Sequence, residues 1–472
     1  MSLTSSGVRT PLLPEQVAAF AAQLRGPVIQ PGDPSYDEAR AVYNAMIDKH
    51  PALIAQCANV ADVMATVNLA REHGLPLAVR GGGHNGAGLG TVEGGIVLDL
   101  GLMHGIRVDP TARTARVEGG ATLGDVHHAT FPFGLVTPSG IISTTGVGGI
   151  TLGGGLGYLT RKFGLAIDNL LEADVVLADG TLVTTSPDQH PDLFWALRGG
   201  GGNFGVVTSF LFRLHPLPNL TAGPMLWPLD RGGDLLRWYR EFSPQAPDDV
   251  YCFFVFMTVP SATPFPEHLW GQKMCGVMWA LTGGMDATAS PLAAVRAHLG
   301  EPALDWVAPI THPALQSMFD ALYPPGDQWY WKADFVAEIP DQAVATHLQH
   351  AAALPTWKST MHLYPIDGAA GRVPRDATAW GYRDAKWGMV IVGVSPDPAD
   401  APDLIAWARS YWAELHPHSA GGAYSNMMMD ATDEGAARVR SAYGDNYPRL
   451  TQVKRTYDPG NLFQINLNIA PA

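Results

Sequence analysis

The sequence lacks several features that would assign it to a special class of protein. Charged residues make up only 16% of the chain, which is low for a disordered or coiled-coil protein. The cysteines Cys57, Cys252 and Cys275 form no CxxC pair, so neither a disulfide framework nor a zinc site is predicted. No His/Asp/Glu cluster has metal-site spacing, so we expect no metal. There is no apolar run of about 18 residues and no signal-peptide pattern at the start, so we expect no membrane span and a cytoplasmic location.

The excess of acidic residues excludes another class of partner. The chain has 30 Lys+Arg and 44 Asp+Glu, which gives a net charge of −14. Nucleic-acid phosphates require basic surfaces, so no nucleic-acid partner is expected. What the chain does have is 46% hydrophobic residues in 472, enough for two or three domains with a large core. The sequence does not predict an oligomeric state.

The pattern of apolar residues predicts an α+β protein with two parts. Short strands and helices alternate from about residue 50, beginning with a strand at 51–58 and a helix at 59–74 that Asn59 caps and Gly74 ends. Four prolines near 216–230 indicate a domain boundary. Longer strand-like runs alternate with helices after it, which predicts a broad sheet with helices on one face.

The segment RGGGHNGAGLG, residues 80–90, places a glycine run and a histidine between two expected strands. Successive glycines can present several backbone N–H groups to one anion, so the loop favours a phosphate site with Arg80 at its rim. It is not a Rossmann loop, because a strand rather than a helix follows it, and no P-loop motif is present. A glycine-rich turn with nothing bound is the alternative that these residues alone leave open.

Five segments carry a family resemblance. VRGGGHNGAGLG (79–90) and TPSGIISTTGVGGITLGGGLGYLTRKFGL (137–165) resemble the FAD-binding domain of the vanillyl-alcohol oxidase / p-cresol methylhydroxylase (PCMH) type, and especially the berberine bridge enzyme-like subgroup. DLFWALRGGGGNFGVVTSF, YGDNYPRLTQVKRTYDPGNLF and the final INLNI agree and keep the family's order. The resemblance implies a PCMH-type FAD-binding domain built from residues 1–220 and 431–472. It also implies a substrate-binding domain, residues 221–430, with a large antiparallel sheet covered by helices.

The resemblance implies that FAD is the cofactor and assigns its contacts. His84 would be bonded covalently to the flavin 8α-methyl group, and Val207 would meet the adenosine half through its backbone. Asn466 and Asn468 would face the pyrimidine edge of the flavin. The other implied contacts, to the phosphates, the FAD backbone and the isoalloxazine ring, are Arg80, Gly81, Gly82, Gly83, Asn85, Ser139, Thr144, Thr145, Gly146, Gly149, Gly153, Gly154, Gly155 and Gly157.

A second covalent link is not expected. Some family members have a cysteine in a C-P-x-x-G stretch of the later glycine segment, but this chain reads ISTTG there, with Ile142 in the cysteine's place. A single link implies a less open flavin face. We therefore expect a small organic substrate rather than an oligosaccharide.

The proton acceptor is not fixed by the resemblance. The berberine bridge enzymes use a glutamate on a substrate-domain strand, and the matching stretch 367–383 contains none. Tyr424 resembles a tyrosine that projects toward the flavin in related oxidases, and Tyr158 lies beside GGGLG. Both are catalytic candidates, and for Tyr424 a packed core tyrosine is the alternative.

Lys332 is the third catalytic candidate. The two-residue period of a strand places it on one face with Tyr330 and Asp334, and we expect this polar face to point toward the cofactor cavity. A Lys332–Asp334 pair exposed to solvent is the alternative.

The expected reaction is a two-electron oxidation of an alcohol, amine or phenolic secondary metabolite. Flavin N5 accepts the hydride while the protein supplies orientation and a base. O2 is the expected reoxidant, giving H2O2. The alternatives are a dehydrogenase that uses another acceptor and a non-catalytic flavin- or ligand-binding protein.

Overall fold

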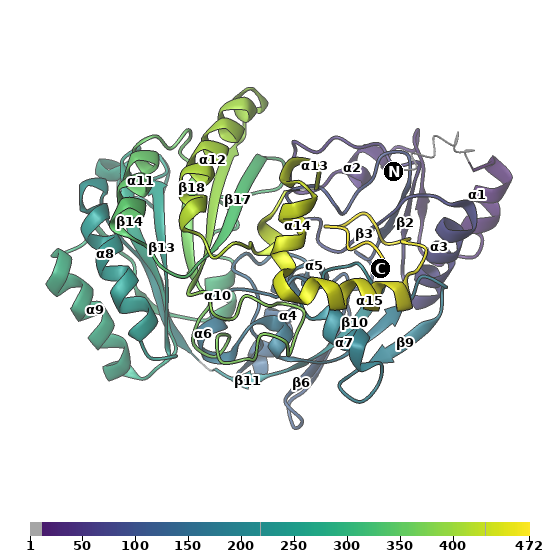
Figure 1. Ribbon diagram of the computed structural model, residues 1–472, viewed down its shortest axis with the longest axis horizontal. Coiled ribbons are helices and arrows are strands. Elements are labelled where there is room, and N and C mark those ends of the chain that lie inside the picture. Colours follow the sequence, from purple (N-terminus) through teal and green to yellow (C-terminus); the bar gives the residue numbers. More distant parts are fainter. Residues whose placement is uncertain (1–11, 218, 430) are drawn as a thin grey trace.

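The computed structural model describes residues 12–217, 219–429 and 431–472. Its strands form three large sheets and one small two-stranded sheet. The two sheets of the N-terminal segment lie in one half of the molecule, and the eight-stranded sheet forms the other half (Figure 1). In the described part of the chain, no helix has both the length and the hydropathy needed to cross a bilayer.

The first sheet is mainly parallel and ends at the first glycine loop. Its order is β1-β2-β4-β3, and β2 and β3 both pair in parallel with β4. Helix α3 (Val60–His73) connects β2 to β3; the Asn59 side chain accepts the Asp62 N–H at its start, and Gly74 ends it with φ 60°, which confirms the predicted helix. The strands are β1 (Val28–Ile29), β2 (Leu53–Gln56), β3 (Leu77–Arg80) and β4 (Ile96–Asp99). The glycine loop therefore starts at the carboxyl edge of parallel strands, where ligands commonly bind in α/β folds.

The second sheet is antiparallel, with the order β5-β6-β10-β8-β9. The hairpins expected at 106–119 and 173–186 are both present. Its strands are β5 (Ile106–Asp109), β6 (Thr114–Glu118), β8 (Leu170–Val176), β9 (Leu182–Thr185) and β10 (Val206–Arg213). The other elements of this half are α1 (Pro14–Ala21), α2 (Tyr36–Arg40), α4 (Leu123–Thr130), α5 (Val147–Leu152), α6 (Thr160–Phe163), α7 (Pro191–Leu197), and the pair β7 (Leu135–Val136) and β11 (His215–Pro216).

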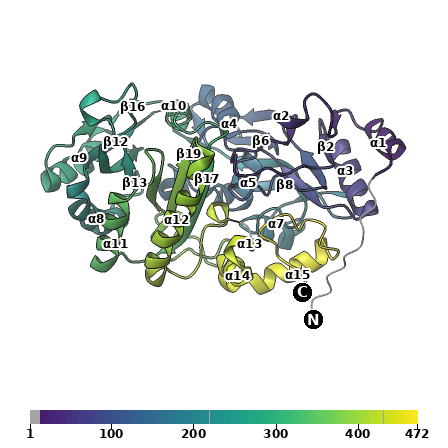
Figure 2. The same cartoon turned by 90° about the horizontal axis from the view of Figure 1, so that it is seen from above.

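The third sheet is antiparallel, with the order β15-β12-β14-β13-β18-β19-β17 and β16 paired to β12. Helices α8, α9, α11 and α12 cover one of its faces (Figure 2). Its central strands are almost entirely buried, which explains their continuous apolar runs. The strands are β12 (Leu220–Pro228), β13 (Val250–Thr258), β14 (Lys273–Leu281), β15 (Leu304–Asp305), β16 (Ala308–Ile310), β17 (Gln328–Val336), β18 (Thr360–Pro365) and β19 (Trp387–Ser395), and the helices are α8 (Gly232–Phe242), α9 (Met285–Leu299), α10 (His312–Gln316), α11 (Asp341–Ala352) and α12 (Ala401–Leu415).

The C-terminal segment returns to the first half of the molecule. Helices α13 (Ala431–Glu434), α14 (Ala436–Tyr443) and α15 (Tyr447–Tyr457) run back toward it, as the yellow ribbon in Figure 1 shows. Buried Lys454 fixes this return by donating to the Asn203 carbonyl (2.7 Å) and to Asp458 (2.6 Å). The residues after α15 thus reach the same cavity as the glycine loops. Cys57, Cys252 and Cys275 are free and buried.

Candidate active site

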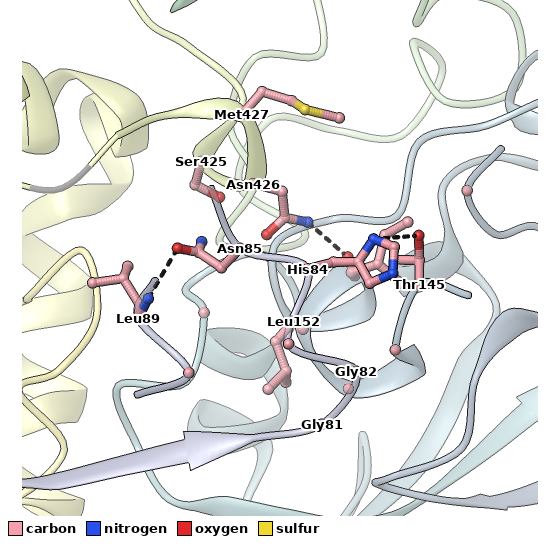
Figure 3. A pocket seen from close by; sticks show the side chains of 18 of the residues that line it. Gly81, Gly82, His84, Asn85, Leu89, Thr145, Leu152, Ser425, Asn426 and Met427 are labelled. Atoms are coloured by element: carbon pink, nitrogen blue, oxygen red, sulfur yellow. Dashed lines mark hydrogen bonds between the residues drawn. The ribbon is translucent and has the colours of Figure 1, made fainter. Parts of the chain in front are cut away.

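A large cavity lies where the two halves meet. It encloses about 2040 Å³, counting the solvent at its mouth. Its wall on one side is formed by the first glycine loop, the segment 140–150, the loop 201–207 and the final residues 465–467. The strands β17, β18 and β19 and the loop 424–427 form the other side. Figure 3 shows Ser425, Asn426 and Met427 coming from a different segment than the loop that carries Gly81, Gly82 and His84.

Two glycines allow the two glycine segments to cross in direct contact. A Cβ placed on Gly82 would lie 2.4 Å from the Gly146 nitrogen, and a Cβ on Gly146 would lie 2.2 Å from the Gly82 nitrogen. Both contacts are with backbone, which cannot rotate away. The glycine at each position is therefore required by the crossing itself, and the crossing forms the floor of the cavity.

The backbone of the first loop fits an anion. Within the described chain, the N–H groups of residues 81–85 donate to no protein acceptor, although these residues line the cavity. Buried or cavity-facing N–H groups are normally paired, and a run of free ones forms a nest for phosphate oxygens. Arg80 does not act as a free charge at the rim, because its guanidinium is paired with Asp99 at 2.8 Å and both side chains are largely buried.

His84 lies in the wall next to this loop, with its ring stacked on Tyr43 at a centroid distance of 3.9 Å. Its Nδ1 is 3.5 Å from the Thr145 hydroxyl (Figure 3). Its Nε2 is 3.0 Å from the Thr144 hydroxyl. Burial lowers the pKa of His84 to about 4, against a smaller opposing effect of a hydrogen bond to the backbone of Thr144. The imidazole is therefore neutral near pH ~7 and keeps a lone pair for bonding.

The structure brings most of the expected cofactor contacts to one cavity. Those in its wall are Arg80, Gly81, Gly82, Gly83, His84, Asn85, Thr145, Gly146, Gly149, Val207 and Asn466. Thr144 lines an adjoining hollow on the outer side of the glycine loop. Ser139 and Asn468 are outside the wall; Ser139 is buried and bonded to His127 at 2.9 Å, and the Asn468 carbonyl oxygen is buried without a partner among the described residues.

Gly153, Gly154, Gly155 and Gly157 are also outside the wall. We expected them to let the chain approach the isoalloxazine ring, but they pack against protein. A Cβ on Gly153 would meet the Asn426 amide at 2.1 Å, and one on Gly157 would meet the Ser139 carbonyl at 2.0 Å. Gly154 and Gly155 have positive φ values of 134° and 84°. Gly153, Gly154 and Gly155 contact the loop that carries Tyr424 and Asn426, so their effect on the cavity is indirect.

Tyr424 lines the cavity, and three hydrogen-bond donors converge on its hydroxyl oxygen. Its hydroxyl oxygen accepts the N–H of Gly155 (3.0 Å), the N–H of Leu156 (3.3 Å) and the amide of Asn426 (2.9 Å). Burial raises the pKa of Tyr424, and the three hydrogen bonds oppose this rise. The three donors reduce the cost of negative charge on this oxygen, but burial is the larger effect and keeps the pKa above its usual value.

Lys332 does not face the cavity, which corrects the expected orientation of β17. Trp329 and Trp331 line the cavity instead. The Lys332 ammonium contacts Asp433 at 2.8 Å and Glu434 at 3.1 Å on the opposite face. The sequence period was right, but the tryptophans rather than the charges face the cavity, because α13 supplies the ionic partners of Lys332 on the other side.

The neighbours of Lys332 follow the same arrangement. The Tyr330 hydroxyl donates to Asp433 at 2.8 Å, and the carboxylate of Asp334, which is fully buried, contacts His416 at 3.0 Å and also Arg438. The solvent-exposed Lys332–Asp334 pair is therefore not formed either. This face of β17 is a buried network that binds the sheet to the C-terminal segment.

Tyr158 is also outside the cavity wall. Its ring is buried and packs edge-on against Tyr251 and parallel to Phe253, at centroid distances of 6.3 and 6.4 Å. Its hydroxyl has no hydrogen-bond partner among the described residues. Burial raises the pKa of Tyr158. Its place is that of a core tyrosine between the two halves.

The sequence reasoning missed part of the sheet side of the cavity. Beside Trp329, Trp331 and Tyr364, this side contains residues that no sequence signal had singled out: Tyr323, Thr360, His362, Val390 and Val392. The segment TMHLYP has period two, with Thr360, His362 and Tyr364 on one face, and this pattern could have identified the row. Tyr43, which stacks on His84, carries no motif that would have revealed it.

Comparisons with known proteins agree with this geometry. The protein-family model described as "FAD binding domain" matches residues 51–186, and the family model described as "Berberine and berberine like" matches residues 423–470. The (R)-6-hydroxynicotine oxidase of Paenarthrobacter nicotinovorans is 32% identical over 468 residues, covering 96% of this chain and 98% of that protein. The chain belongs to the berberine bridge enzyme-like FAD-linked oxidoreductases.

Solved structures of berberine bridge enzyme-like oxidoreductases and related oxidases have the same fold. A crystal structure of 6-hydroxy-D-nicotine oxidase from Arthrobacter nicotinovorans superposes with a TM-score of 0.83 at 29% identity, over 95% of this chain and 98% of that one. A xylooligosaccharide oxidase from Myceliophthora thermophila has a TM-score of 0.84 at 24% identity, over 97% and 99%. The first prediction, an α+β fold with a PCMH-type FAD-binding part and a large antiparallel sheet, is confirmed. The enzyme is an FAD-linked oxidoreductase of the oxidase type, and FAD is its cofactor.

Proposed function

We propose that this berberine bridge enzyme-like oxidoreductase oxidises an alcohol, amine or phenolic substrate and passes the electrons to O2, giving H2O2. The observation that carries the proposal is the run of free N–H groups at residues 81–85, placed beside a neutral histidine and opposite an aromatic wall in one cavity. Bound FAD would supply hydride acceptance at N5. The residues of this chain would bind FAD, orient the substrate and exchange a proton with it.

The proposed cofactor contacts follow the wall of the cavity. The free N–H groups of the first loop support its assignment to the phosphates. Gly149 has no atom within 4 Å of a placed Cβ, so its side of the cavity is open to a ligand. Val207 and Asn466 stay in the proposed set, because both line the cavity. Ser139, Asn468 and the glycines at 153–157 would act only through their neighbours.

We further propose that His84 carries a single covalent link to the flavin. The lowered pKa of its ring and the long 3.5 Å contact at Nδ1 leave one nitrogen neutral and weakly engaged. Ile142, at the place where other family members have a second cysteine link, lines the same cavity but has no reactive group. The absence of a reactive group at Ile142 supports one link rather than two.

We propose Tyr424 as the proton acceptor. An acceptor must lie within hydrogen-bond reach of the substrate, and Tyr424 lines the cavity whereas Lys332 and Tyr158 do not. The donors from Gly155, Leu156 and Asn426 stabilise negative charge on its oxygen. Proton removal by Tyr424 would accompany hydride loss from the substrate carbon.

Two further parts of the proposal concern the whole chain. We propose that residues 1–220 and 431–472 form the FAD-binding domain and residues 221–430 the substrate-binding domain. The strands of the eight-stranded sheet, which run from 220 to 395, support this division, while Tyr424 and Asn426 bring the end of the second segment into the cavity. The three buried free thiols are compatible with the reducing cytoplasm as the proposed compartment.

The proposal is tested by anaerobic mixing of the FAD-loaded enzyme with a panel of alcohols, amines, phenols and sugars. Bleaching of the flavin absorbance by an alcohol, amine or phenol is the expected result. Subsequent mixing of the reduced enzyme with air should restore the colour rapidly and release H2O2. Slow reoxidation would identify a dehydrogenase with another acceptor, and a panel that bleaches nothing would favour a flavin-binding protein without catalysis.

A further inference from the structure

The sheet side of the cavity is a regular row of side chains from three adjacent strands. Trp329 and Trp331 come from β17, and Val390 and Val392 come from β19. Strand β18, which pairs with β19, contributes the row Thr360, His362 and Tyr364. Two-residue alternation along each strand directs these side chains to one surface. The wall is thus aromatic and aliphatic, with its polar atoms concentrated on β18.

This wall has no formal charge. Among the described residues that line the cavity, Arg80 is the one Asp, Glu, Lys or Arg. Arg80 lies across the cavity in the first glycine loop and is already neutralised by Asp99 at 2.8 Å. A charged group brought against the sheet side would lose its hydration without gaining an ionic partner, which is strongly unfavourable. The sheet side therefore favours uncharged ligand groups.

His362 is the most prominent polar group in this row. Its Nδ1 is hydrogen-bonded to the Tyr364 hydroxyl, and both rings pack on Phe253 of the neighbouring strand β13, at centroid distances of 5.3 and 4.9 Å. This bond occupies Nδ1, so Nε2 is the nitrogen left for a ligand. Burial lowers the pKa of His362 to about 3, so the ring is neutral and adds no charge to the wall.

We propose that His362, held in place by Tyr364, determines substrate specificity by hydrogen-bonding an uncharged oxygen or nitrogen on an aromatic ring that packs against Trp329 and Trp331. This inference rests on the proposed function, because it names the substrate class of the same cavity. Trp331 is well placed for the packing, since Gly86 of the first glycine loop leaves no room for a side chain beside its indole. A Cβ on Gly86 would lie 2.2 Å from that ring, so the loop backbone packs directly against one side of the Trp331 indole.

A second histidine–tyrosine pair provides a matched control. His347 Nδ1 lies 2.6 Å from the Tyr411 hydroxyl, and burial lowers the pKa of His347 to about 3 as well. This pair joins α11 and α12, on the helix-covered side of the sheet. It has the chemistry of the His362–Tyr364 pair without access to the cavity. Loss of a buried pair as such can therefore be separated from loss of a ligand contact.

The test measures equilibrium binding to the FAD-loaded enzyme by titration of the flavin absorbance spectrum. Three ring probes are used: benzamide, which is neutral and polar; benzoate, its charged analogue; and ethylbenzene, which has no polar group. Benzamide should bind at least about tenfold more tightly than either of the others, because a hydrogen bond is gained without burial of a charge. His362→Leu should weaken benzamide binding about tenfold and leave ethylbenzene binding unchanged. Tyr364→Phe should weaken benzamide binding less, and His347→Leu should leave both affinities at the wild-type value.

Several results would overturn the assignment. They are equal affinities of wild-type enzyme for benzamide and benzoate, no binding of any probe to the flavin-loaded enzyme, or wild-type benzamide affinity in His362→Leu. If His362→Leu does not fold, the Tyr364→Phe titration and the wild-type comparison of benzamide with benzoate decide the question. A wild-type protein that holds no flavin would contradict the proposed function itself. A flavin-loaded protein that does not discriminate among the probes would contradict only the role of His362.

Discussion

Gly82→Ala should disrupt the crossing on which the cofactor site is built. The added methyl group would lie 2.4 Å from the Gly146 nitrogen and 2.7 Å from its Cα, about 1 Å inside ordinary van der Waals contact. Overpacking in a rigid interior destabilises by about 1–3 kcal/mol. Both clashing atoms are backbone, so we expect the upper end of this range.

This strain should appear mainly as loss of FAD. The loop that must shift to relieve the clash is the one whose free N–H groups are proposed to hold the phosphates. The loop can relieve this penalty of about 3 kcal/mol by leaving its FAD-binding conformation. In that case FAD binds roughly a hundredfold more weakly. The assay is flavin absorbance per mole of purified protein, followed by thermal unfolding with and without added FAD.

A control glycine and a clear contrary result accompany this prediction. Gly460 has no atom within 4 Å of a placed Cβ, so Gly460→Ala should keep the flavin content and unfolding midpoint of the wild type. Wild-type flavin content and stability in Gly82→Ala would refute the reasoning, because they would show that the two glycine segments are not in backbone contact.

Three other predictions concern the base, the buried ionic network and pH. Tyr424→Phe should slow anaerobic flavin reduction about 10²-fold or more with flavin content unchanged, and an unchanged rate would remove Tyr424 from proton transfer. Lys332→Met leaves buried Glu434 without its cation and should destabilise by about 3–5 kcal/mol while the reduction rate of the folded enzyme changes little; a large rate loss at wild-type stability would restore Lys332 as a base. Burial lowers the pKa of His312 to about 4 and of His347 to about 3, so the unfolded chain takes up protons first as the pH falls. Their contribution to stability is complete above pH ~6.5 and is lost progressively as the pH falls toward their folded pKa values, so the unfolding midpoint should already fall between about pH 7 and pH 5, and a flat profile would contradict this.

The sequence was sufficient for the elements whose signals are local. The helix after Asn59 and the hairpins at 106–119 and 173–186 appear where capping residues, turn residues and periodicity predict them. The first glycine loop was also recognisable, because the need for glycine there comes from close approach of backbone.

Orientation was harder to predict than position. On β17 the alternation of side chains was correct, but the cavity-facing side was assigned to Lys332 when Trp331 occupies it. The deciding partners, Asp433 and Glu434, lie about a hundred residues later, and no local pattern joins them to the strand. Likewise, the glycines at 153–155 serve contacts with Asn426 and Tyr424 that only the folded chain creates.

The most direct test of the account is whether the flavin stays with the polypeptide after acid precipitation. The wild-type pellet should be yellow, because His84 holds the flavin covalently, and His84→Ala should bind FAD reversibly and give a colourless pellet with a yellow supernatant. His128→Ala, which removes an exposed histidine of α4, should behave as wild type. A colourless wild-type pellet would contradict the covalent link, and purified protein without flavin absorbance even after addition of FAD would contradict the cofactor site as a whole.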